Sequence, residues 1–484
     1  MNSYTKIAIA LLLHFPLYAL TLPEAVEHTL ETNPQMKKSV SDYFAVKNDL
    51  DIASSGYRPT LDFKGAIGEE TSDKERLGDE VTLTRTETQL IANQNLFEGF
   101  GTQYSIDEQE ARVDASRFNA MQDANSIGLR ATQVYLEVLR EKKLLDLLFS
   151  NVKAHERIYK MIKQKTDSGL SRRSDLEQTQ GRLALAYSNY ISQQNNYQDA
   201  LINFERVYGQ IRSASDLELP SLPQLPASDK TGLIKVALKH SPTLMIEKAN
   251  IKTQESRYEK DKNGFYPTLD LELAANWNDN IDGIERKDDS YHAMLRLNYN
   301  LYTGGNDEST RLKNMQLVTS VKESFNEQQR AVIEKVSLAF VAERLLANQV
   351  KCLKAHTEKT RQTADSYAKE YRLGRRTILD LLNTELEYNR AQQAVENAEF
   401  DRLLSRYRIL EGTGVLPLVL KNSVAQRIDA ELMEDIATTE QDNNIKLIGE
   451  TDEFIQIKDI CEDISSSAKA SLSTNAKTVA LSLN

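Results

Sequence analysis

The sequence predicts a mainly α-helical protein in which one structural unit, a β-hairpin followed by a long coiled-coil helical hairpin, occurs twice. Three observations support this prediction: an internal repeat, long proline-free segments with coiled-coil spacing, and two pairs of segments in which apolar and polar residues alternate. The chain of 484 residues holds only 10 Pro and 19 Gly, and its long stretches rich in Ala, Leu, Glu, Gln, Lys and Arg favour helix.

The internal repeat is marked by the heptapeptide Gly-Tyr-Arg-Pro-Thr-Leu-Asp at residues 56–62, which returns as Gly-Phe-Tyr-Pro-Thr-Leu-Asp at residues 264–270. Further landmarks follow in the same order, because residues 95–99 correspond to 300–304. A register that is kept through several landmarks indicates an internal duplication. We therefore divide the chain into a first repeat, a Pro-rich linker and a second repeat, at residues 20–209, 210–230 and 231–416.

The two ends of the chain lack the sequence patterns of the repeats. Lys6 precedes an apolar run, and Ala19 offers a small residue for cleavage, so residues 1–19 have the form of a secretory signal peptide. Residues 417–484 are acidic, polar and without periodicity, so we expect a largely disordered tail. Cys352 lies in a helical segment and Cys461 in this tail, and we expect both to be free thiols.

Each repeat ends in a predicted helical hairpin, over residues 102–209 and 306–412. In the first hairpin, apolar residues recur at alternating spacings of three and four, which is the seam of a coiled coil, and Glu141 and His155 are its polar interruptions. The residues of this seam are Ala124, Ile127, Ala131, Val134, Val138, Leu145, Leu148, Val152, Tyr159 and Ile162. A turn around Gly169 reverses the chain, and Ser174 is the expected cap of the returning helix. At about 1.5 Å per residue, each outgoing helix is ~100 Å long.

Each repeat also contains a predicted β-hairpin, over about residues 60–97 and 268–302. The second is the clearer, since its apolar residues alternate with Asp, Glu, Asn, His and Arg. The residues predicted to form one apolar, lipid-facing surface are Leu269, Leu271, Leu273, Trp277, Tyr291, Leu295, Leu297 and Tyr299.

Such strands fit either a soluble sheet over a core or a membrane β-barrel. We favour the barrel because the helices pair with each other and because a signal peptide is expected. Four strands are too few to close a barrel in lipid, where no open edge is tolerated. Several chains must therefore combine, and strand count alone leaves two, three or four protomers open.

Composition and motifs argue against several other functions. The formal net charge of −11 disfavours nucleic acid as a partner. The histidines are scattered without zinc spacing, and the sequence has no nucleophile elbow or phosphate loop. We therefore predict no enzymatic activity, no cofactor and no metal site.

Taken together, these residues resemble the TolC-type outer-membrane efflux and secretion channels over about residues 22–416. The marks of this resemblance are the two Pro-Thr-Leu-Asp strand entries, residues 301–305 (Leu-Tyr-Thr-Gly-Gly) and residues 371–382 (Tyr-Arg-Leu-Gly-Arg-Arg-Thr-Ile-Leu-Asp-Leu-Leu). In the first repeat, Phe100 stands between two glycines where the family usually has paired glycines.

The resemblance implies a homotrimer with a 12-strand barrel in the cell outer membrane and an α-helical tunnel through the periplasm. It also implies docking to a periplasmic adaptor (membrane fusion protein) and to an inner-membrane ABC or proton-driven transporter. The chain would then be a passive exit duct, and protein export by type I secretion and multidrug efflux stay open as alternatives. A more distant alternative is a secreted coiled-coil structural protein without a pore.

The resemblance further implies that the periplasmic tip of the tunnel is gated. By position, Tyr371 and Arg376 would reach Ser174 and Asp175 of a neighbouring hairpin. Asp380 would form a ring of carboxylates at the pore constriction, whereas Asn383 stands where the family often has a second aspartate.

Overall fold

The computed structural model describes residues 19–73, 80–210 and 213–420. The signal peptide predicted for residues 1–19 lies outside these ranges except for its last residue, and the predicted tail lies outside them from residue 421 onward. The chain divides into two compact units. One unit comprises residues up to Met36, Ala124–Lys239 and the chain from Ile333, and the other comprises Lys37–Asp123 and His240–Val332.

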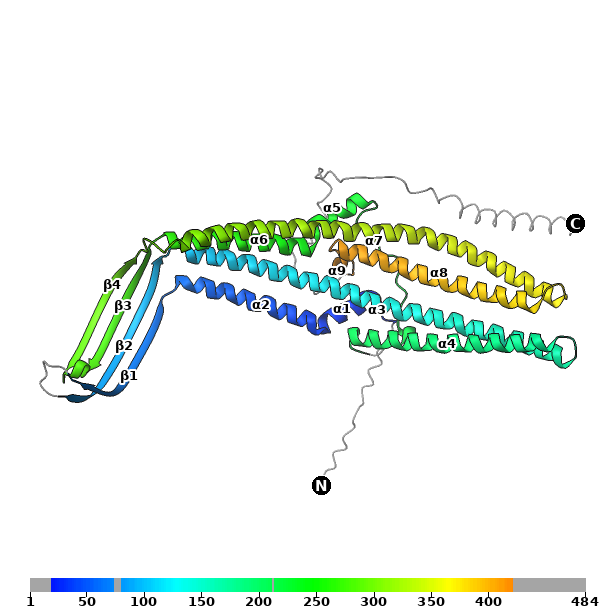
Figure 1. The fold of residues 1–484 in the computed structure, drawn as a ribbon, viewed down its shortest axis with the longest axis horizontal. Helices are drawn as coiled ribbons and strands as arrows, with labels where there is room; N and C mark the ends of the chain where they lie inside the picture. The colour runs from blue at the N-terminus through cyan, green and yellow to red at the C-terminus, as the bar shows by residue number, and fades with distance from the viewer. Residues whose placement is uncertain (1–18, 74–79, 211–212, 421–484) are drawn as a thin grey trace, which may run out of the picture. The chain divides into compact units, whose positions relative to one another are not determined.

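The order of the helices and strands repeats along the chain, as Figure 1 shows. The first copy contains α1 (Leu22–Thr32), α2 (Pro34–Ser54), β1 (Thr60–Ser72), β2 (Val81–Phe97), α3 (Gly101–Asp167) and α4 (Arg173–Tyr208). The second contains α5 (Lys230–His240), α6 (Pro242–Lys260), β3 (Thr268–Asp279), β4 (Lys287–Asn298), α7 (Asn306–Arg372) and α8 (Ile378–Gly412), followed by the short α9 (Leu416–Val419). The predicted fold class, mainly helical with duplicated β-hairpins and helical hairpins, is confirmed.

Proline and glycine set the boundaries of these elements. Pro34 and Pro242 stand at the first turns of α2 and α6, where a missing N–H costs nothing. Asn33 Oδ1 accepts a hydrogen bond of 2.8 Å from the backbone N–H of Gln35, as a cap does. The expected cap at Ser174 is wrong, because α4 begins at Arg173 and its N-cap is Arg172, two residues before Ser174.

In the unit that holds the sheet, the strands are antiparallel and follow the order β1-β2-β3-β4 (Figure 1). The two hairpins are joined by the pairing of β2 with β3, from Thr86 opposite Asp279 to Phe97 opposite Leu269, with a bulge between Asn95 and Phe97. Strands from both repeats therefore form one continuous sheet. The outer edges, β1 and β4, have no strand partner among the described residues.

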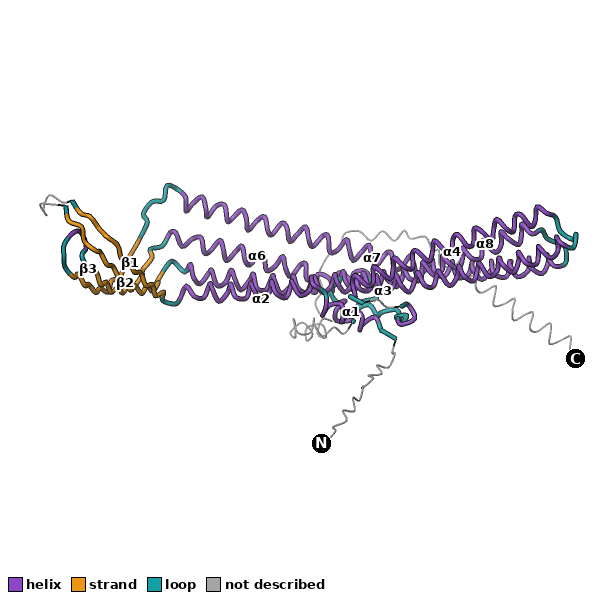
Figure 2. Tube along the Cα trace, turned by 90° about the horizontal axis from the view of Figure 1, so that it is seen from below, coloured by secondary structure: helices purple, strands orange, loops and turns teal. Residues whose placement is uncertain are grey.

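In the other unit, the α3–α4 and α7–α8 hairpins turn at the same end, which Figure 2 shows. The predicted seam of α3 is largely buried, since Ala131, Val134, Val138 and Val152 are each at most 3% exposed. Such burial of one stripe per helix holds a coiled coil together.

The Pro-rich segment between the repeats is fastened to this unit. Leu217 pairs with Leu20 in a short parallel bridge, and the hydroxyl of buried Tyr135 lies 2.7 Å from the carbonyl oxygen of Leu20 and 2.6 Å from that of Glu218. Arg406 also donates a 3.0 Å hydrogen bond to the carbonyl of Pro223.

None of the helices within the described ranges combines the length and apolar character that crossing a bilayer requires.

Candidate functional site: a two-faced sheet and the hairpin tips

The sheet presents one continuous apolar face. Leu269 lies opposite Leu297 and Leu271 opposite Leu295, so the apolar residues predicted on β3 and β4 share one face. The register continues across the sheet, because Leu273 pairs with Ala92. The neighbouring strands add Leu61, Phe63, Ile67 and Leu90 to this face. Tyr299 follows the end of β4 and is also exposed.

Among the residues that the structure describes, this apolar face is largely uncovered. Leu295 is 65% exposed, Leu297 69% and Phe63 71%. Near the end of the β3–β4 hairpin, the Trp277 indole N–H donates a 2.9 Å hydrogen bond to the hydroxyl of Tyr291, and their rings meet edge to face. A contiguous exposed apolar surface of this kind marks contact with a membrane or another protein.

The opposite face of the sheet is polar and internally paired. Glu272 accepts hydrogen bonds from Arg296 at 2.6 and 2.9 Å, and one of its oxygens lies 3.1 Å from Nε2 of His292. Asn276 donates a 3.1 Å hydrogen bond to Ser290. One sheet thus separates an apolar surface from a charged one.

The junctions that lead from strand to helix require left-handed backbone. In the second repeat, the paired glycines Gly304 and Gly305 take φ values of 69° and 83°. In the first repeat, Gly99 and Phe100 take the same conformation, with φ of 64° and 65°. The departure at Phe100 therefore places a bulky side chain in a conformation that favours glycine.

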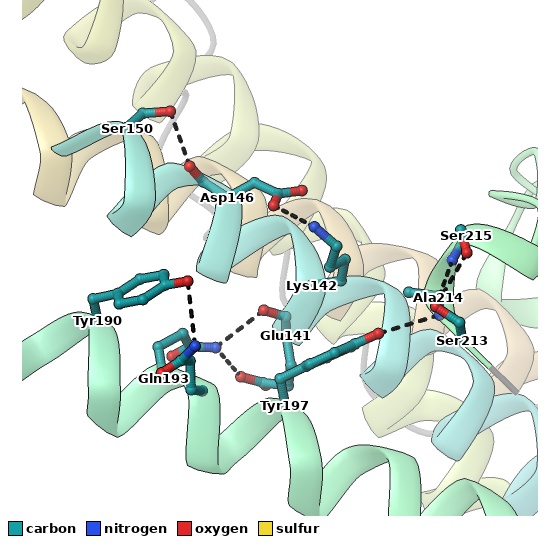
Figure 3. A network of polar contacts seen from close by, with 11 residues as sticks. Glu141, Lys142, Asp146, Ser150, Tyr190, Gln193, Tyr197, Ser213, Ala214 and Ser215 are labelled. Carbon is teal, nitrogen blue, oxygen red and sulfur yellow. Dashed lines mark hydrogen bonds and ion pairs between the residues drawn. The ribbon is translucent and has the colours of Figure 1, made fainter. Parts of the chain in front are cut away.

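The carboxylate of Glu141, which interrupts the apolar seam, finds its hydrogen-bond partners inside the α3–α4 hairpin. Figure 3 shows Gln193 of α4 facing Glu141, to which its amide donates hydrogen bonds of 2.6 Å at the carboxylate and 3.2 Å at the backbone carbonyl. Arg140 lies 2.9 Å from the same carboxylate. Nearby, the Tyr197 hydroxyl accepts a 3.2 Å hydrogen bond from the N–H of Ala214, which joins α4 to the segment that follows it (Figure 3). A buried carboxylate needs such partners.

The hairpin tips are held together by an apolar cluster that joins the two repeats. Its buried members are Ile158, Ile162, Tyr371, Ile378, Leu381 and Leu382. Tyr371, one of the predicted gate residues, is 9% exposed, and its ring lies 4.5 Å from the ammonium of Lys165. Burial, and then the nearby charge of Asp175, raise the pKa of the Tyr371 hydroxyl.

Arg376, the second predicted gate residue on this hairpin, is engaged within its own hairpin. Its Nε donates a 2.8 Å hydrogen bond to Glu370, and its guanidinium carbon lies 4.2 Å from the ring centroid of Tyr367. Asp175 accepts a 2.9 Å hydrogen bond from the hydroxyl of Ser171. Ser174 is exposed on the first turn of α4.

The two residues predicted for the pore constriction have separate partners. Asp380 and Thr377 form a capping box at the start of α8, in which the Thr377 hydroxyl oxygen accepts a 3.2 Å hydrogen bond from the Asp380 backbone N–H and the Asp380 carboxylate accepts one of 3.2 Å from the Thr377 backbone N–H. The Thr377 hydroxyl also donates to this carboxylate at 2.9 Å. This hydroxyl and the Thr377 backbone N–H lower the pKa of Asp380. Asn383 accepts a 3.0 Å hydrogen bond from Arg182 of α4. This residue therefore links the two hairpins, at the position where the resemblance led us to expect a second aspartate.

The predicted free thiol at Cys352 is wrong, since this cysteine is disulfide-bonded. Cys461 lies outside the described residues. Within the described residues, no group of His, Cys, Asp and Glu side chains could hold a metal ion.

Sequence reasoning missed Lys165, Arg182 and Glu370 as partners of the predicted tip residues. Glu370 lies six residues before Arg376, and the end of α7 and the following turn lie between them. The sequence therefore gives only a weak local indication that these two residues pair. Lys165 and Arg182 reach partners that are about 200 positions away in sequence, and no spacing rule links such residues.

Comparisons with known proteins match most of the chain. The pattern of the family described as "Outer membrane efflux protein" matches residues 25–210 and 233–415. The outer membrane efflux protein BepC of Brucella suis is 23% identical over 400 residues, which is 81% of this chain and 85% of BepC. The alkaline protease secretion protein AprF of Pseudomonas aeruginosa is 22% identical over 474 residues, 92% of this chain and 96% of AprF.

The fold also matches a solved channel. The crystal structure of the Campylobacter jejuni outer membrane channel CmeC superposes with a TM-score of 0.73 and 13% sequence identity, over 86% of this chain and 89% of that one. The family model covers both repeats, so these findings favour the channel over the alternative of a secreted coiled-coil structural protein without a pore. The chain belongs to the TolC-type outer membrane efflux protein family, a family of non-enzymatic channels of the outer membrane with a periplasmic helical tunnel.

Proposed function

We propose that three copies of this chain form a passive exit duct, gated at its periplasmic tip, that serves type I protein secretion. The proposal rests on two features that occur on the same chain. One is a four-stranded sheet with an apolar face and a charged face, and the other is a pair of helical hairpins in which each helix has more than 30 residues. The family to which the chain belongs forms trimeric channels, which supports three copies over two or four.

The open edges of the sheet support the barrel. Strands β1 and β4 lack strand partners among the described residues, and an open edge cannot exist in lipid. Pairing β4 of one copy with β1 of the next would close twelve strands into a barrel. Lipid then contacts the face of Leu295, Leu297 and Phe63, and water in the lumen contacts Glu272 and Arg296.

The helices that extend into the periplasm also carry apolar residues without cover in a single chain. Ile191 and Ile202 of α4 are each 61% exposed, and Leu338 of α7 is 64% exposed. Contacts between protomers would bury them and stabilise each by roughly 1.5–3 kcal/mol when burial is complete. This is the support for a tunnel made of helices from several chains.

For the gate, we propose that Arg376 exchanges partners. In the open state it holds Glu370 and Tyr367 of its own hairpin. In the closed state it reaches Ser174 and Asp175 of a neighbouring protomer, while Asp380 and Asn383 line the constriction. A periplasmic adaptor that favours the first arrangement opens the duct.

The cargo is proposed from one relative and from a sequence feature. AprF, a protein named for secretion of an alkaline protease, matches along nearly its whole length. The acidic, polar composition of residues 417–484 also favours protein export. Multidrug efflux is the second candidate, since BepC is named an efflux protein. An inner-membrane ABC or proton-driven transporter and its adaptor would choose between them.

Two experiments test this function. Purified protein should require detergent and run as a heat-modifiable trimer, whereas a water-soluble monomer would end the proposal. In planar bilayers, Arg376→Ala combined with Tyr371→Phe should raise conductance, and unchanged conductance would remove the gate while leaving the duct.

Cargo is tested in cells. Deletion of the gene should abolish export of specific proteins into the medium with little change in drug sensitivity. Increased drug sensitivity with normal protein export would favour efflux instead.

A further inference from the structure

The apolar face of the sheet contains a hollow of about 450 Å³, which lies within the range of about 300–1,000 Å³ that small-molecule sites have. We propose that this hollow binds one acyl chain of a lipid in the outer leaflet of the outer membrane. This site depends on the proposed function, in which the apolar face contacts lipid. It adds one defined place on that face where a single lipid is held.

Small and large side chains alternate around the hollow. In one row across the sheet, Leu273 of β3 lies between Ala92 of β2 and Ala293 of β4. In the next row the order is reversed, because Ala275 of β3 lies between a leucine of β2 and a tyrosine of β4. Side chains of one face stand roughly perpendicular to the sheet, so the three alanines form a floor and their larger neighbours form walls. The lining includes Leu90, Ala92, Leu273, Ala275, Tyr291 and Ala293.

The hollow lies at the depth of the hydrocarbon. Strands β3 and β4 have 12 residues each, slightly more than the about 9–11 residues with which a tilted strand spans a bilayer. The lining residues of these strands fall in the middle third of each, at positions 273–275 and 291–293. Water is excluded at this depth, and a void would lose the van der Waals contacts of its lining. The position therefore selects hydrocarbon as the occupant.

A polar pair stands at the end of the hollow that is nearer to the β3–β4 turn. The hydroxyl of Tyr291 accepts a 2.9 Å hydrogen bond from the indole N–H of Trp277, which lies two residues closer to the turn than Ala275. This hydroxyl can donate its own proton to a second partner, since a phenol both accepts and donates. Aromatic residues with a polar edge gather at the membrane–water interface. The ester carbonyl at the junction of a lipid headgroup and its chain is the acceptor found at that level.

The direction of the strands selects the leaflet. Strand β3 follows α6 and β4 leads to α7, so the helices join the strands at the end away from the β3–β4 turn (Figure 1). In this family the helical tunnel lies in the periplasm, so the turn is at the cell surface. A lipid whose ester meets Tyr291 and whose chain runs over Ala293 toward the bilayer centre therefore belongs to the outer leaflet.

The site is tested by the fluorescence of Trp277, which is the only tryptophan of the chain. The purified channel is reconstituted in vesicles of phosphatidylcholine that carries bromine either near the ester end or near the methyl end of one acyl chain. Bromine near the ester end should quench Trp277 more strongly. Ala293→Phe should remove much of this quenching, because the added ring fills the hollow. Ala293 lies opposite Leu273 and Trp277 opposite Asp289, so the ring stays clear of the indole.

Leu295→Phe is the matched control, because it adds a ring to the same face of β4 outside the hollow and should leave the quenching unchanged. Equal quenching in the native channel and in both variants would overturn the site while leaving the duct. Stronger quenching by bromine near the methyl end, lost in Ala293→Phe, would overturn the outer leaflet.

Two further checks keep the result decisive. If neither brominated lipid quenches Trp277 in any form of the channel, the sheet does not face lipid, and the proposed function falls together with the site. Each variant is first shown to run as a heat-modifiable trimer. If Ala293→Phe does not assemble, Ala293→Leu takes its place, because it also fills the hollow with a smaller change in volume.

Discussion

The ammonium of Lys165 lies over the ring of Tyr371, 4.5 Å from its centroid, and thereby joins the last turn of α3 to the last turn of α7. These two helices belong to different repeats. The contact sits on the apolar cluster at the hairpin tips, so one tyrosine contributes packing, a cation–π contact and a hydroxyl.

Tyr371→Phe should leave tip stability nearly unchanged, because the ring retains both its packing and the Lys165 contact. Tyr371→Ala should destabilise the tip by about 3–5 kcal/mol, since it removes a buried aromatic side chain. Limited proteolysis at the α7–α8 turn measures the difference. Equal protection of the two variants would mean that the ring does not hold the hairpins together.

Glu370→Gln should lower conductance in planar bilayers, which is opposite to the effect of Arg376→Ala. The substitution weakens the hold of Glu370 on Arg376, so the guanidinium becomes available to a neighbouring chain. Glu358→Gln is the control, because it breaks a similar pair with Arg361 three turns earlier on α7. If Glu370→Gln raises conductance, the exchange of partners is wrong.

Lowering the pH should destabilise the α3–α4 hairpin through His155. This side chain is 3% exposed, and burial, followed by the charge of Arg182, lowers its pKa. The unfolded chain then binds the proton more readily, so stability is complete above the ordinary value of about 6.5 and falls as the pH drops toward the lowered pKa.

Melting temperatures between pH 7.5 and 5 check this, and His155→Leu should flatten the dependence. His356→Leu, at an exposed position of α7, should leave it unchanged. An identical slope in His155→Leu would assign the proton uptake to another group.

The junction glycines should differ in their tolerance of alanine. Gly99 and Gly304 occupy equivalent positions and both have positive φ. A Cβ on Gly99 would lie 2.8 Å from Cβ of Tyr266 and 3.1 Å from Cα of Asn263, whereas one on Gly304 would meet nothing within 4 Å. Gly304→Ala should therefore cost only the backbone penalty of about 1–2 kcal/mol, and Gly99→Ala clearly more. Similar losses in thermal unfolding would show that the backbone conformation alone decides.

Tyr135→Phe should destabilise its unit by about 1–3 kcal/mol, because the carbonyl oxygens of Leu20 and Glu218 lose the hydroxyl between them. Urea unfolding measures this loss. Tyr187→Phe should have a much smaller effect, because the Tyr187 hydroxyl bonds Glu156 at an exposed position.

The regular parts of this fold could be predicted because their signals are local. The seam from Ala124 to Ile162 follows from spacing along a single helix, and the structure buries most of it. The alternation of Leu269 to Trp277 likewise gives the apolar face of β3. Resemblance, rather than spacing, singled out Tyr371, Arg376 and Asp380.

The rest depends on contacts between distant parts of the chain. Nothing near Tyr135 indicates that its hydroxyl meets Leu20 and Glu218, and nothing near Cys352 indicates a disulfide. Arg376 was assigned partners on a neighbouring hairpin, and its nearer partner Glu370 was overlooked. Partner choice at a hairpin tip is decided by side-chain reach, which sequence periodicity does not encode.

The pairing of β2 with β3 has a consequence for biogenesis. These strands are separated by the whole α3–α4 hairpin and by α5 and α6, so the middle of the sheet cannot form until most of the polypeptide has been exported. Until then β2 offers a bare hydrogen-bonding edge beside apolar side chains, which is a hazard for aggregation. Newly translocated chains should therefore depend on holding chaperones until the second repeat arrives.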